Sequence, residues 1–249
     1  MGLFDKIFGT YSQRELKKIY PIRDKVLALD EEYQKLSDAE LRANTDKLKA
    51  LETELASDRL LTLTCDVSCE ENVNAAVAAA RETFGPIHIL VNNAGIWRDV
   101  AGFSEASTDL WRKYLDVNLM GTVHFTKAVI DEMTGNGYGR IINVASVAGV
   151  YGNAKMSFYS ATKGAVISLT KALAKEVTGL GVTVNAVSPG SVSPAEQADI
   201  DYTQPSQLSF AGRTGSCREN ADLICFLASE KAGYISGQNI QIDGCRKKQ

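Results

Sequence analysis

The sequence has few histidines and no excess of basic charge. Its 249 residues include two His, 27 Lys or Arg and 30 Asp or Glu, which gives a net charge of −3 at pH 7. Binding to a phosphate backbone needs a surplus of Lys and Arg, so nucleic acid is not expected as a main partner. The short basic run Arg246-Lys247-Lys248 is interpreted as a solvated tail.

Long apolar runs are also absent. None approaches the roughly 18–20 residues of a membrane span, and the first residues lack the basic start and apolar core of a signal peptide. We therefore expect no membrane partner and a cytoplasmic protein. The composition, 45% apolar and 23% charged, is that of a globular chain long enough for one large α/β domain.

The cysteines do not form a ligand pattern. They are odd in number and scattered: Cys65, Cys69, Cys217, Cys225 and Cys245. The first two straddle a predicted strand end and helix start, a poor metal-ligand geometry without histidines nearby. The sequence predicts reduced thiols and no metal site. His88, in a predicted buried strand, and His124, in a predicted helix, are expected to be structural.

Strands and helices alternate along most of the chain. Apolar runs predict strands at residues 59–64, 87–91, 140–144, 182–187 and 239–242. Helical patterns predict helices from a Ser68-Cys69-Glu70-Glu71 cap to Phe84, and at 108–133, 157–178 and 218–229, with a loop from 144 to Met156. This alternation predicts an α/β fold with a doubly wound parallel sheet.

The first fifty residues have a different pattern. Residues 14–35 have helical periodicity that Pro21 should interrupt, and Ser37-Asp38-Ala39-Glu40 is a capping box that opens a second helix. We predict a helical leader at 1–50 and one α/β domain at 51–249.

The most informative motif is the pair Tyr159 and Lys163, one helical turn apart, after Ser146. Tyrosine is a poor acid at neutral pH, and a lysine at i+4 lies within about 5–6 Å and favours the phenolate. Ser146 could hold a carbonyl oxygen against the Tyr159 hydroxyl while a hydride reaches the carbon. The pattern predicts general acid–base catalysis beside a nicotinamide.

Further motifs occur in a defined order around this pair. They are Asp66-Val67, Asn92-Asn93-Ala94-Gly95, Asn118, Pro189-Gly190 and Ile242-Asp243-Gly244. In this order the chain resembles the short-chain dehydrogenase/reductase family from about residue 51 to 248, and in particular its 3-oxoacyl-carrier-protein reductase branch. The resemblance implies a Rossmann-like fold and NAD(P)-dependent reduction of a carbonyl, or oxidation of a secondary alcohol, as in fatty acid biosynthesis.

The resemblance also implies roles for individual residues. Tyr159 would be the general acid, Lys163 its pKa-lowering partner and ribose clamp, Ser146 the carbonyl holder, and Asn118 a helix-bending residue that holds a water. The implied cofactor-binding set also includes Asp66, Val67, Asn93, Ala94, Gly95, Pro189, Gly190, Val192 and Ser193. The implied partners are a small-molecule or carrier-bound carbonyl substrate, beneath a lid at 191–213, and further copies of the chain in a dimer or tetramer.

The chain departs from the family pattern at its start. The family opens with a strand, a Gly-rich turn and a helix that hold the cofactor pyrophosphate. Before Asp66 the only glycines are Gly2 and Gly9, so we expect a Rossmann-like sheet truncated by its first βαβ portion and weak binding of NAD or NADP. Without the first two strands, the 59–64 strand is predicted to pair with the 87–91 strand in a five-stranded sheet.

Residues 1–49 resemble instead the N-terminus of the bacterial preprotein translocase motor, without its nucleotide-binding motifs. Two alternatives to an active enzyme therefore stay open. The chain could be a non-catalytic remnant or fusion product without turnover, or an interaction protein that docks through its leader.

Overall fold

The computed structural model describes residues 60–193 and 209–247. Residues 63–192, 209–215 and 219–247 belong to the larger of two compact units, which contains the sheet and the site described below. The described residues of the smaller unit are 60–62, 193 and 216–218; within it the Cys217 thiol donates to the Ser193 carbonyl oxygen at 3.7 Å. The predicted leader helices lie outside the described residues.

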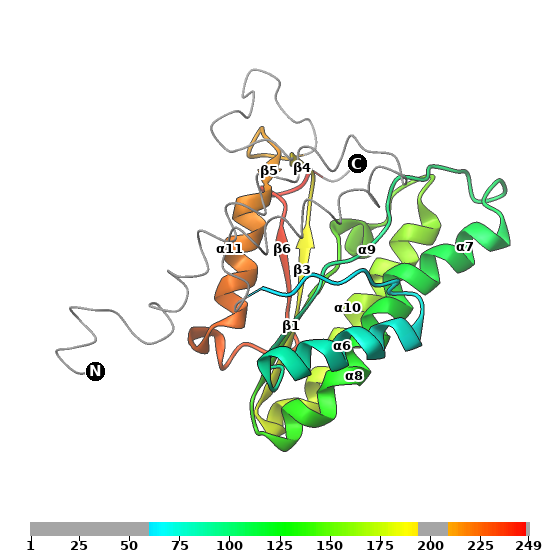
Figure 1. Cartoon of the computed structure of the whole chain (residues 1–249). Helices are drawn as coiled ribbons and strands as arrows, with labels where there is room; N and C mark the ends of the chain where they lie inside the picture. The colour runs from blue at the N-terminus through cyan, green and yellow to red at the C-terminus, as the bar shows by residue number, and fades with distance from the viewer. Residues whose placement is uncertain (1–59, 194–208, 248–249) are drawn as a thin grey trace. The chain divides into compact units, whose positions relative to one another are not determined.

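The larger unit is built on a parallel sheet of four strands (Figure 1). Its order is β1 (Ile89–Asn92), β2 (Gly139–Val144), β3 (Val182–Pro189) and β6 (Asn239–Ile242). The register pairs Ile89 with Arg140, Gly139 with Val182, and Ala186 with Asn239. The predicted α/β fold with a parallel sheet is confirmed, and all four carboxyl ends lie at one edge, where such sheets bind ligands.

The predicted strand at 59–64 was wrong, and so was the five-stranded sheet. Residues 60–64 form no strand, so β1 is an edge strand of the described sheet. An apolar run becomes a strand only where a neighbour offers a ladder of hydrogen bonds, and apolarity alone does not report pairing. His88, expected in a buried strand, is exposed and lies just before β1, on the open edge of the described sheet.

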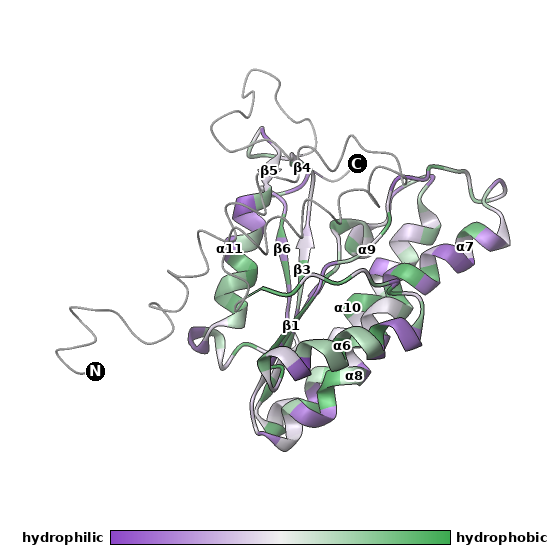
Figure 2. Cartoon of the chain, in the orientation of Figure 1, coloured by the Kyte–Doolittle hydropathy of each residue, from purple (hydrophilic) through white to green (hydrophobic). Residues whose placement is uncertain are grey.

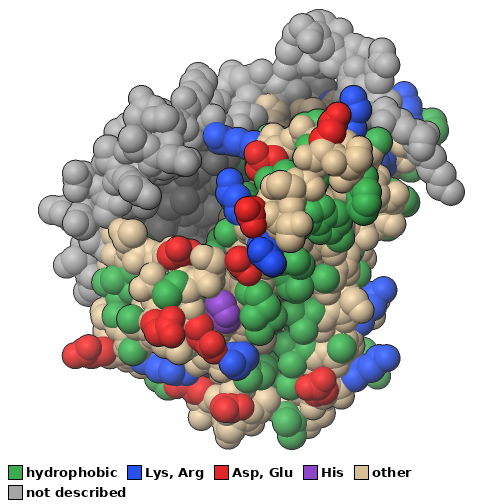
Figure 3. Space-filling model, turned by 90° about the vertical axis from the view of Figure 1, so that its right-hand side faces the viewer, with side chains coloured by type: hydrophobic (Ala, Val, Ile, Leu, Met, Phe, Trp, Pro, Cys, Tyr) green, Lys and Arg blue, Asp and Glu red, His purple; other side chains and the backbone are tan. Residues whose placement is uncertain are grey.

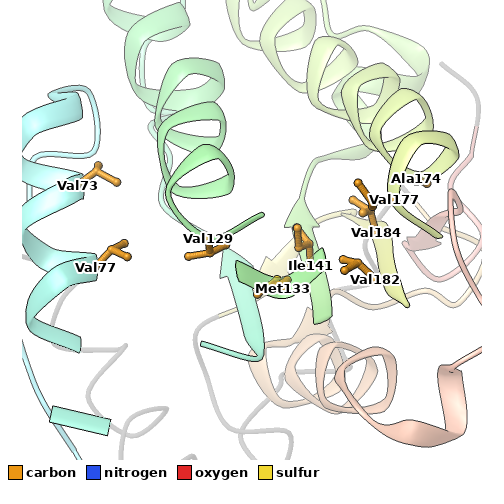
Figure 4. Close-up of a cluster of buried hydrophobic side chains, with 9 residues drawn as sticks. All are labelled: Val73, Val77, Val129, Met133, Ile141, Ala174, Val177, Val182 and Val184. Atoms are coloured by element: carbon orange, nitrogen blue, oxygen red, sulfur yellow. The ribbon is translucent and has the colours of Figure 1, made fainter. Parts of the chain in front are cut away.

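Helices cover both faces of the sheet. On one face α6 (Glu70–Phe84), α8 (Gly121–Gly135) and α10 (Ser157–Val177) enclose a core cluster, drawn in Figure 4. Its members are Val73, Val77, Val129, Met133, Ile141, Ala174, Val177, Val182 and Val184. On the other face α11 (Cys217–Ala228) contributes Leu227, which packs with Ile142 and Val187.

Ile141 and Ile142 belong to different clusters because successive strand residues point to opposite faces. In Figure 2 the ribbons of α6 and α8 carry both apolar and polar segments. This mixture is what helices need when one side packs on a sheet and the other meets solvent.

The long helix predicted at 108–133 is interrupted. It consists of α7 (Thr108–Leu115), a π-helical segment η1 (Asp116–Met120) and α8. The Ser107 hydroxyl caps α7 by accepting the Leu110 N–H at 3.1 Å. The π-helical segment carries Asn118, and such bulges occur frequently at functional sites.

Short elements complete the described chain. The loop predicted after β2 contains a helix, α9 (Val147–Tyr151), whose first turn is capped by the Ser146 hydroxyl through the Ala148 N–H at 3.1 Å. The Ser68 hydroxyl, predicted to cap α6, donates to the Asp66 carboxylate instead, and Cys69 takes the cap position. The remaining elements are η2 (Thr178–Leu180), β4 (Val192–Ser193), β5 (Gly215–Ser216) and η4 (Glu230–Ala232).

The contact between α9 and α10 gives a test of this packing. A Cβ on Gly149 would lie 2.5 Å from the Lys163 carbonyl carbon, so Gly149→Ala must push the two backbones apart. We expect a loss of about 1–3 kcal/mol or more in the free energy of unfolding, measured by urea denaturation. Gly179→Ala is the matched control, because nothing lies within 4 Å of its Cβ position. Equal stability of the two variants would contradict this packing.

Candidate active site

Three adjacent strands end at the same edge of the sheet and deliver the first site residues. Asn93, Ala94 and Gly95 follow β1 and are exposed, Ser146 follows β2 by two residues, and Gly190 follows β3. Small, exposed residues after β1 leave room for a ligand to approach the backbone. The helices α7 to α10 then bring Asn118, Tyr159 and Lys163 to this edge.

Tyr159 lies near the start of α10, with its hydroxyl toward Ser146. Burial raises the pKa of the phenol, and a hydrogen bond with the Ser146 hydroxyl lowers it in part. The lowering by Lys163 that the sequence led us to expect is not seen, because the ammonium is turned to a backbone carbonyl instead. Tyr159 is therefore protonated at neutral pH, which is the state that a general acid requires.

Lys163 follows Tyr159 by one helical turn and is 5% exposed. Its Nζ donates to the carbonyl oxygen of Val144, the last residue of β2, at 2.8 Å. Burial lowers the pKa of this amine to about 8, so the group carries its charge at pH 7. An ammonium has three donors, and within the described residues this one makes a single hydrogen bond, so donors remain for a ligand's hydroxyl groups.

Asn118 connects the π-helical segment with the chain that follows β1. Its side chain donates to the Ile96 carbonyl at 2.9 Å and accepts the Ile96 N–H at 2.7 Å. A Cβ on Gly95 would lie 3.1 Å from the Asn118 Oδ1 and 3.3 Å from the Lys163 Nζ. Gly95, Asn118 and Lys163 therefore meet closely, and a side chain at residue 95 would press on both neighbours. The water that the family resemblance implies at Asn118 stays a prediction.

An apolar pocket of about 210 Å³ lies beside β1. It is lined by Val67, Leu90, Val91, Asn92, Asn93, Ala94, Val117, Gly121, Thr122 and Phe125. His124 holds the Val67 segment in place, since its Nδ1 lies 3.1 Å from the Val67 carbonyl oxygen. Asp66 is exposed, and hydrogen bonds from the hydroxyl and the N–H of Ser68 lower the pKa of its carboxyl.

Sequence reasoning found Val67, Asn93 and Ala94 in this pocket but missed its helical wall. Val117, Gly121 and Phe125 stand four residues apart, a spacing that places them on one side of a helix. That spacing was visible in the sequence.

The residues after β3 are only partly brought to the site. Gly190 donates its N–H to the Ile242 carbonyl at 3.0 Å, and a Cβ there would lie 2.8 Å from the Asp243 Cβ. This close approach of two strand ends explains the glycine. Pro189 and Val192 are half-buried in the larger unit, whereas Ser193 belongs to the smaller unit.

The described residues contain no group of three or more His, Cys, Asp or Glu side chains that could hold a metal ion. Within the same part of the chain, no helix has the length and apolar character that a membrane crossing requires.

Comparison with known proteins identifies the family. The sequence model of a family described as enoyl-(acyl carrier protein) reductase matches residues 35–245. The chain is 40% identical over 182 residues to the 3-oxoacyl-(acyl-carrier-protein) reductase FabG of Vibrio cholerae, covering 72% of this chain and 74% of that one. It belongs to the short-chain dehydrogenase/reductase family. By family it is therefore an oxidoreductase.

Other members have different names and similar folds. A 2-dehydro-3-deoxy-L-rhamnonate dehydrogenase (NAD(+)) of a Sphingomonas species is 36% identical over 208 residues, with 82% of each chain covered. A solved structure titled "ElxO with NADP Bound" is 32% identical, covers 80% of this chain and 84% of that one, and has a TM-score of 0.71. The family and this bound neighbour support the use of NAD(P). The apolar pocket beside β1, the open backbone at Gly95 and the Lys163 ammonium fit such a ligand.

The buried ammonium predicts a pH-dependent cost in stability. The pKa of Lys163 falls from its ordinary value of 10.5 to about 8 in the folded state, so the unfolded chain binds the extra proton between these pH values. Stability therefore rises through this window as the folded amine loses its charge. The difference between the two pKa values corresponds to about 3 kcal/mol.

We expect Lys163→Met to remove this dependence. The free energy of unfolding of the variant, minus that of the wild type, should fall by about 3 kcal/mol between pH 7 and pH 11. Urea denaturation at four or five pH values measures it, with the exposed Lys175→Met as control. A difference that stays constant with pH would show that the ammonium is not desolvated.

Proposed function

We propose that the chain transfers a hydride between NAD(P) and a carbonyl or secondary alcohol, with Tyr159 as the general acid. The observation that supports this most directly is the arrangement of a protonated Tyr159 facing Ser146, with the Lys163 ammonium one helical turn away at the end of β2. The favoured substrate is a 3-oxoacyl group on a small molecule or a carrier, in line with the FabG relatives.

The chain's residues would divide the work as follows. The Ser146 hydroxyl donates a hydrogen bond to the substrate oxygen and holds it against the Tyr159 hydroxyl. A bound reduced nicotinamide would supply a hydride to the carbonyl carbon. As negative charge grows on the oxygen, Tyr159 would give up its proton to it, and the Lys163 ammonium would stay on the Val144 carbonyl. In oxidation of an alcohol the proton returns to Tyr159.

The cofactor would lie along the carboxyl edge of the sheet. The pocket beside β1 has the size and apolar lining for the adenine ring, flanked by Asp66 and Val67. Asn93, Ala94 and Gly95 would pass beneath the ribose, Lys163 would bind its hydroxyls, and Pro189, Gly190 and Val192 would lie near the nicotinamide. Asn118 fixes the position of the Gly95 segment through its two hydrogen bonds to the Ile96 backbone.

Two further properties belong to the same proposal. Figure 3 shows apolar side chains gathered between charged ones on the side of the molecule where α7 lies, which supports a homo-oligomer. No disulfide joins the five cysteines, all of which lie in the described residues, and a place in the reducing cytoplasm belongs to the proposal.

Replacing Tyr159 by Phe should abolish most of the turnover. Only the hydroxyl is lost, so the fold is kept, and kcat should fall by about 10²–10⁴-fold, the usual contribution of a general acid. Oxidation of NADH and NADPH, followed at 340 nm with a short 3-oxoacyl thioester, is the measurement. The exposed Tyr234→Phe serves as control. Retained activity in Tyr159→Phe would overturn the assignment, and a wild type without any turnover would favour a non-catalytic remnant.

We also expect weak cofactor binding, because no Gly-rich turn precedes Asp66 in the sequence. Two missing charge-assisted hydrogen bonds, each about 1.5–3 kcal/mol, weaken binding roughly a hundredfold or more. Calorimetric titration with NADH and NADPH, beside the NADP-binding relative ElxO as reference, measures the effect. Dissociation constants equal to those of the reference would show that another segment of the chain binds the cofactor phosphates.

A further inference from the structure

Five aromatic rings form a continuous chain from the loop after β1 to Tyr159. The ring centroids of Phe103 and Trp111 are 6.0 Å apart, and those of Trp111 and Phe158 are 6.2 Å apart. Tyr114 lies 4.6 Å from Phe158 and 6.3 Å from Tyr159. All four contacts are edge-to-face, the favourable geometry for aromatic pairs. Trp111 and Tyr114 come from α7, whereas Phe158 and Tyr159 come from α10.

Tyr114 is the member of this chain that also makes polar contacts. Its side chain is completely buried, and its hydroxyl donates to the Asp99 Oδ2 at 3.1 Å. The same oxygen accepts the Asp99 N–H, also at 3.1 Å. Burial raises the pKa of this phenol to about 12, so the hydroxyl keeps the proton that the Asp99 carboxylate accepts at any physiological pH.

The loop after β1 is therefore held at two points by one helix. Asn118 binds both backbone polar groups of Ile96, and Tyr114, four residues earlier on the same side of the α7–η1 helix, binds Asp99. The next part of the loop is fixed as well, since the Ala101 N–H donates to the Lys155 carbonyl at 2.9 Å, just before α10. Beyond Asp99 the loop exposes Val100 and Phe103, and Trp97 is exposed before it.

We propose that Tyr114 is a positioning residue that acts through two separate parts of its side chain. Its hydroxyl fixes the loop at residues 96–103, whose exposed apolar side chains would contact the substrate, and its ring supports the ring of Tyr159. The effect on turnover rests on the function proposed above. The hydroxyl contact with Asp99 does not.

The two parts can be separated by substitution. Tyr114→Phe keeps the ring but leaves the Asp99 carboxylate and N–H without their partner. Tyr114→Leu removes both the hydroxyl and the edge-to-face contacts. Tyr234→Phe is the matched control, because the Tyr234 side chain is fully exposed.

Hydrogen exchange of backbone amides, read by NMR, is the first test and needs no turnover. In Tyr114→Phe the Asp99 amide should exchange about tenfold faster, the effect of one lost neutral hydrogen bond, while the Ile96 amide held by Asn118 stays unchanged. Unchanged exchange at Asp99 would overturn the proposal, even in a chain without activity.

Steady-state kinetics with the 3-oxoacyl thioester is the second test. Tyr114→Phe should raise KM about fivefold or more with kcat within about twofold, because only the loop is released, whereas Tyr114→Leu should also lower kcat about tenfold as Tyr159 loses its support. Equal falls in kcat in both variants would overturn the division of roles. Circular dichroism checks that each variant is folded, and a loss of activity in Tyr159→Phe reports on the proposed function independently.

Discussion

The hydrogen bond from the Lys163 ammonium to the Val144 carbonyl is the contact on which the site depends. It joins the middle of the site helix α10 to the end of the central strand β2, and it is made by a charge that is almost wholly removed from water. Such a charge is tolerated only where the surrounding backbone approaches it closely and supplies acceptors. Glycines accordingly stand at two positions beside Lys163. Gly95 lies against the ammonium, and Gly149 lies against the backbone of Lys163 and Gly164.

The need to hold the buried Lys163 ammonium in place explains why the site residues lie on packed helices and at strand ends. Tyr159 and Lys163 share α10, whose later turns contribute Ala174 and Val177 to the main core cluster. Asn118 is held by a break in helical geometry, because the π-helical segment turns its amide toward Ile96. The apolar clusters on both faces of the sheet thus offset the cost of a buried charge. Hydrogen bonds and packing within the chain place these groups, which suits proton transfer between them.

The sequence predicted the parts of the fold where pattern and pairing agree. The strands β2, β3 and β6 and the helix α10 lie where apolar runs and helical periodicity indicated them, because each strand has a neighbour in the sheet. Residues 60–64 have the same apolar character but pair with no neighbouring strand, and they do not form a strand. The helix α9 was missed because Val147–Tyr151 is too short to show periodicity, and only the cap at Ser146 signals it.

In the site, the sequence predicted the residues that form a motif with defined spacing, and it did not predict residues that resemble ordinary core positions. Tyr159, Lys163 and Ser146 were singled out by spacing, and the structure brings them together with Asn118 and Gly95. Tyr114 was not, because an aromatic residue in an amphipathic helix is indistinguishable from ordinary core until its hydroxyl is seen to meet Asp99. The break in the helix at Asn118 was implied only by family resemblance. A single amide in a helical pattern does not by itself indicate a π-helical turn.

In the proposed site, proton transfer and binding of the cofactor pyrophosphate depend on different parts of the chain. Proton transfer relies on α7 to α10 and on the ends of β1 and β2, all of which belong to one compact unit. A dinucleotide also needs its pyrophosphate held, and before Asp66 the sequence has only the glycines Gly2 and Gly9. Under the proposed weak binding of the cofactor, the deficit is one of association. Uniform loss of cofactor affinity raises KM for NAD(P) without changing the barrier from the bound complex, so saturating cofactor should restore a rate set by Tyr159, Ser146 and Lys163 alone.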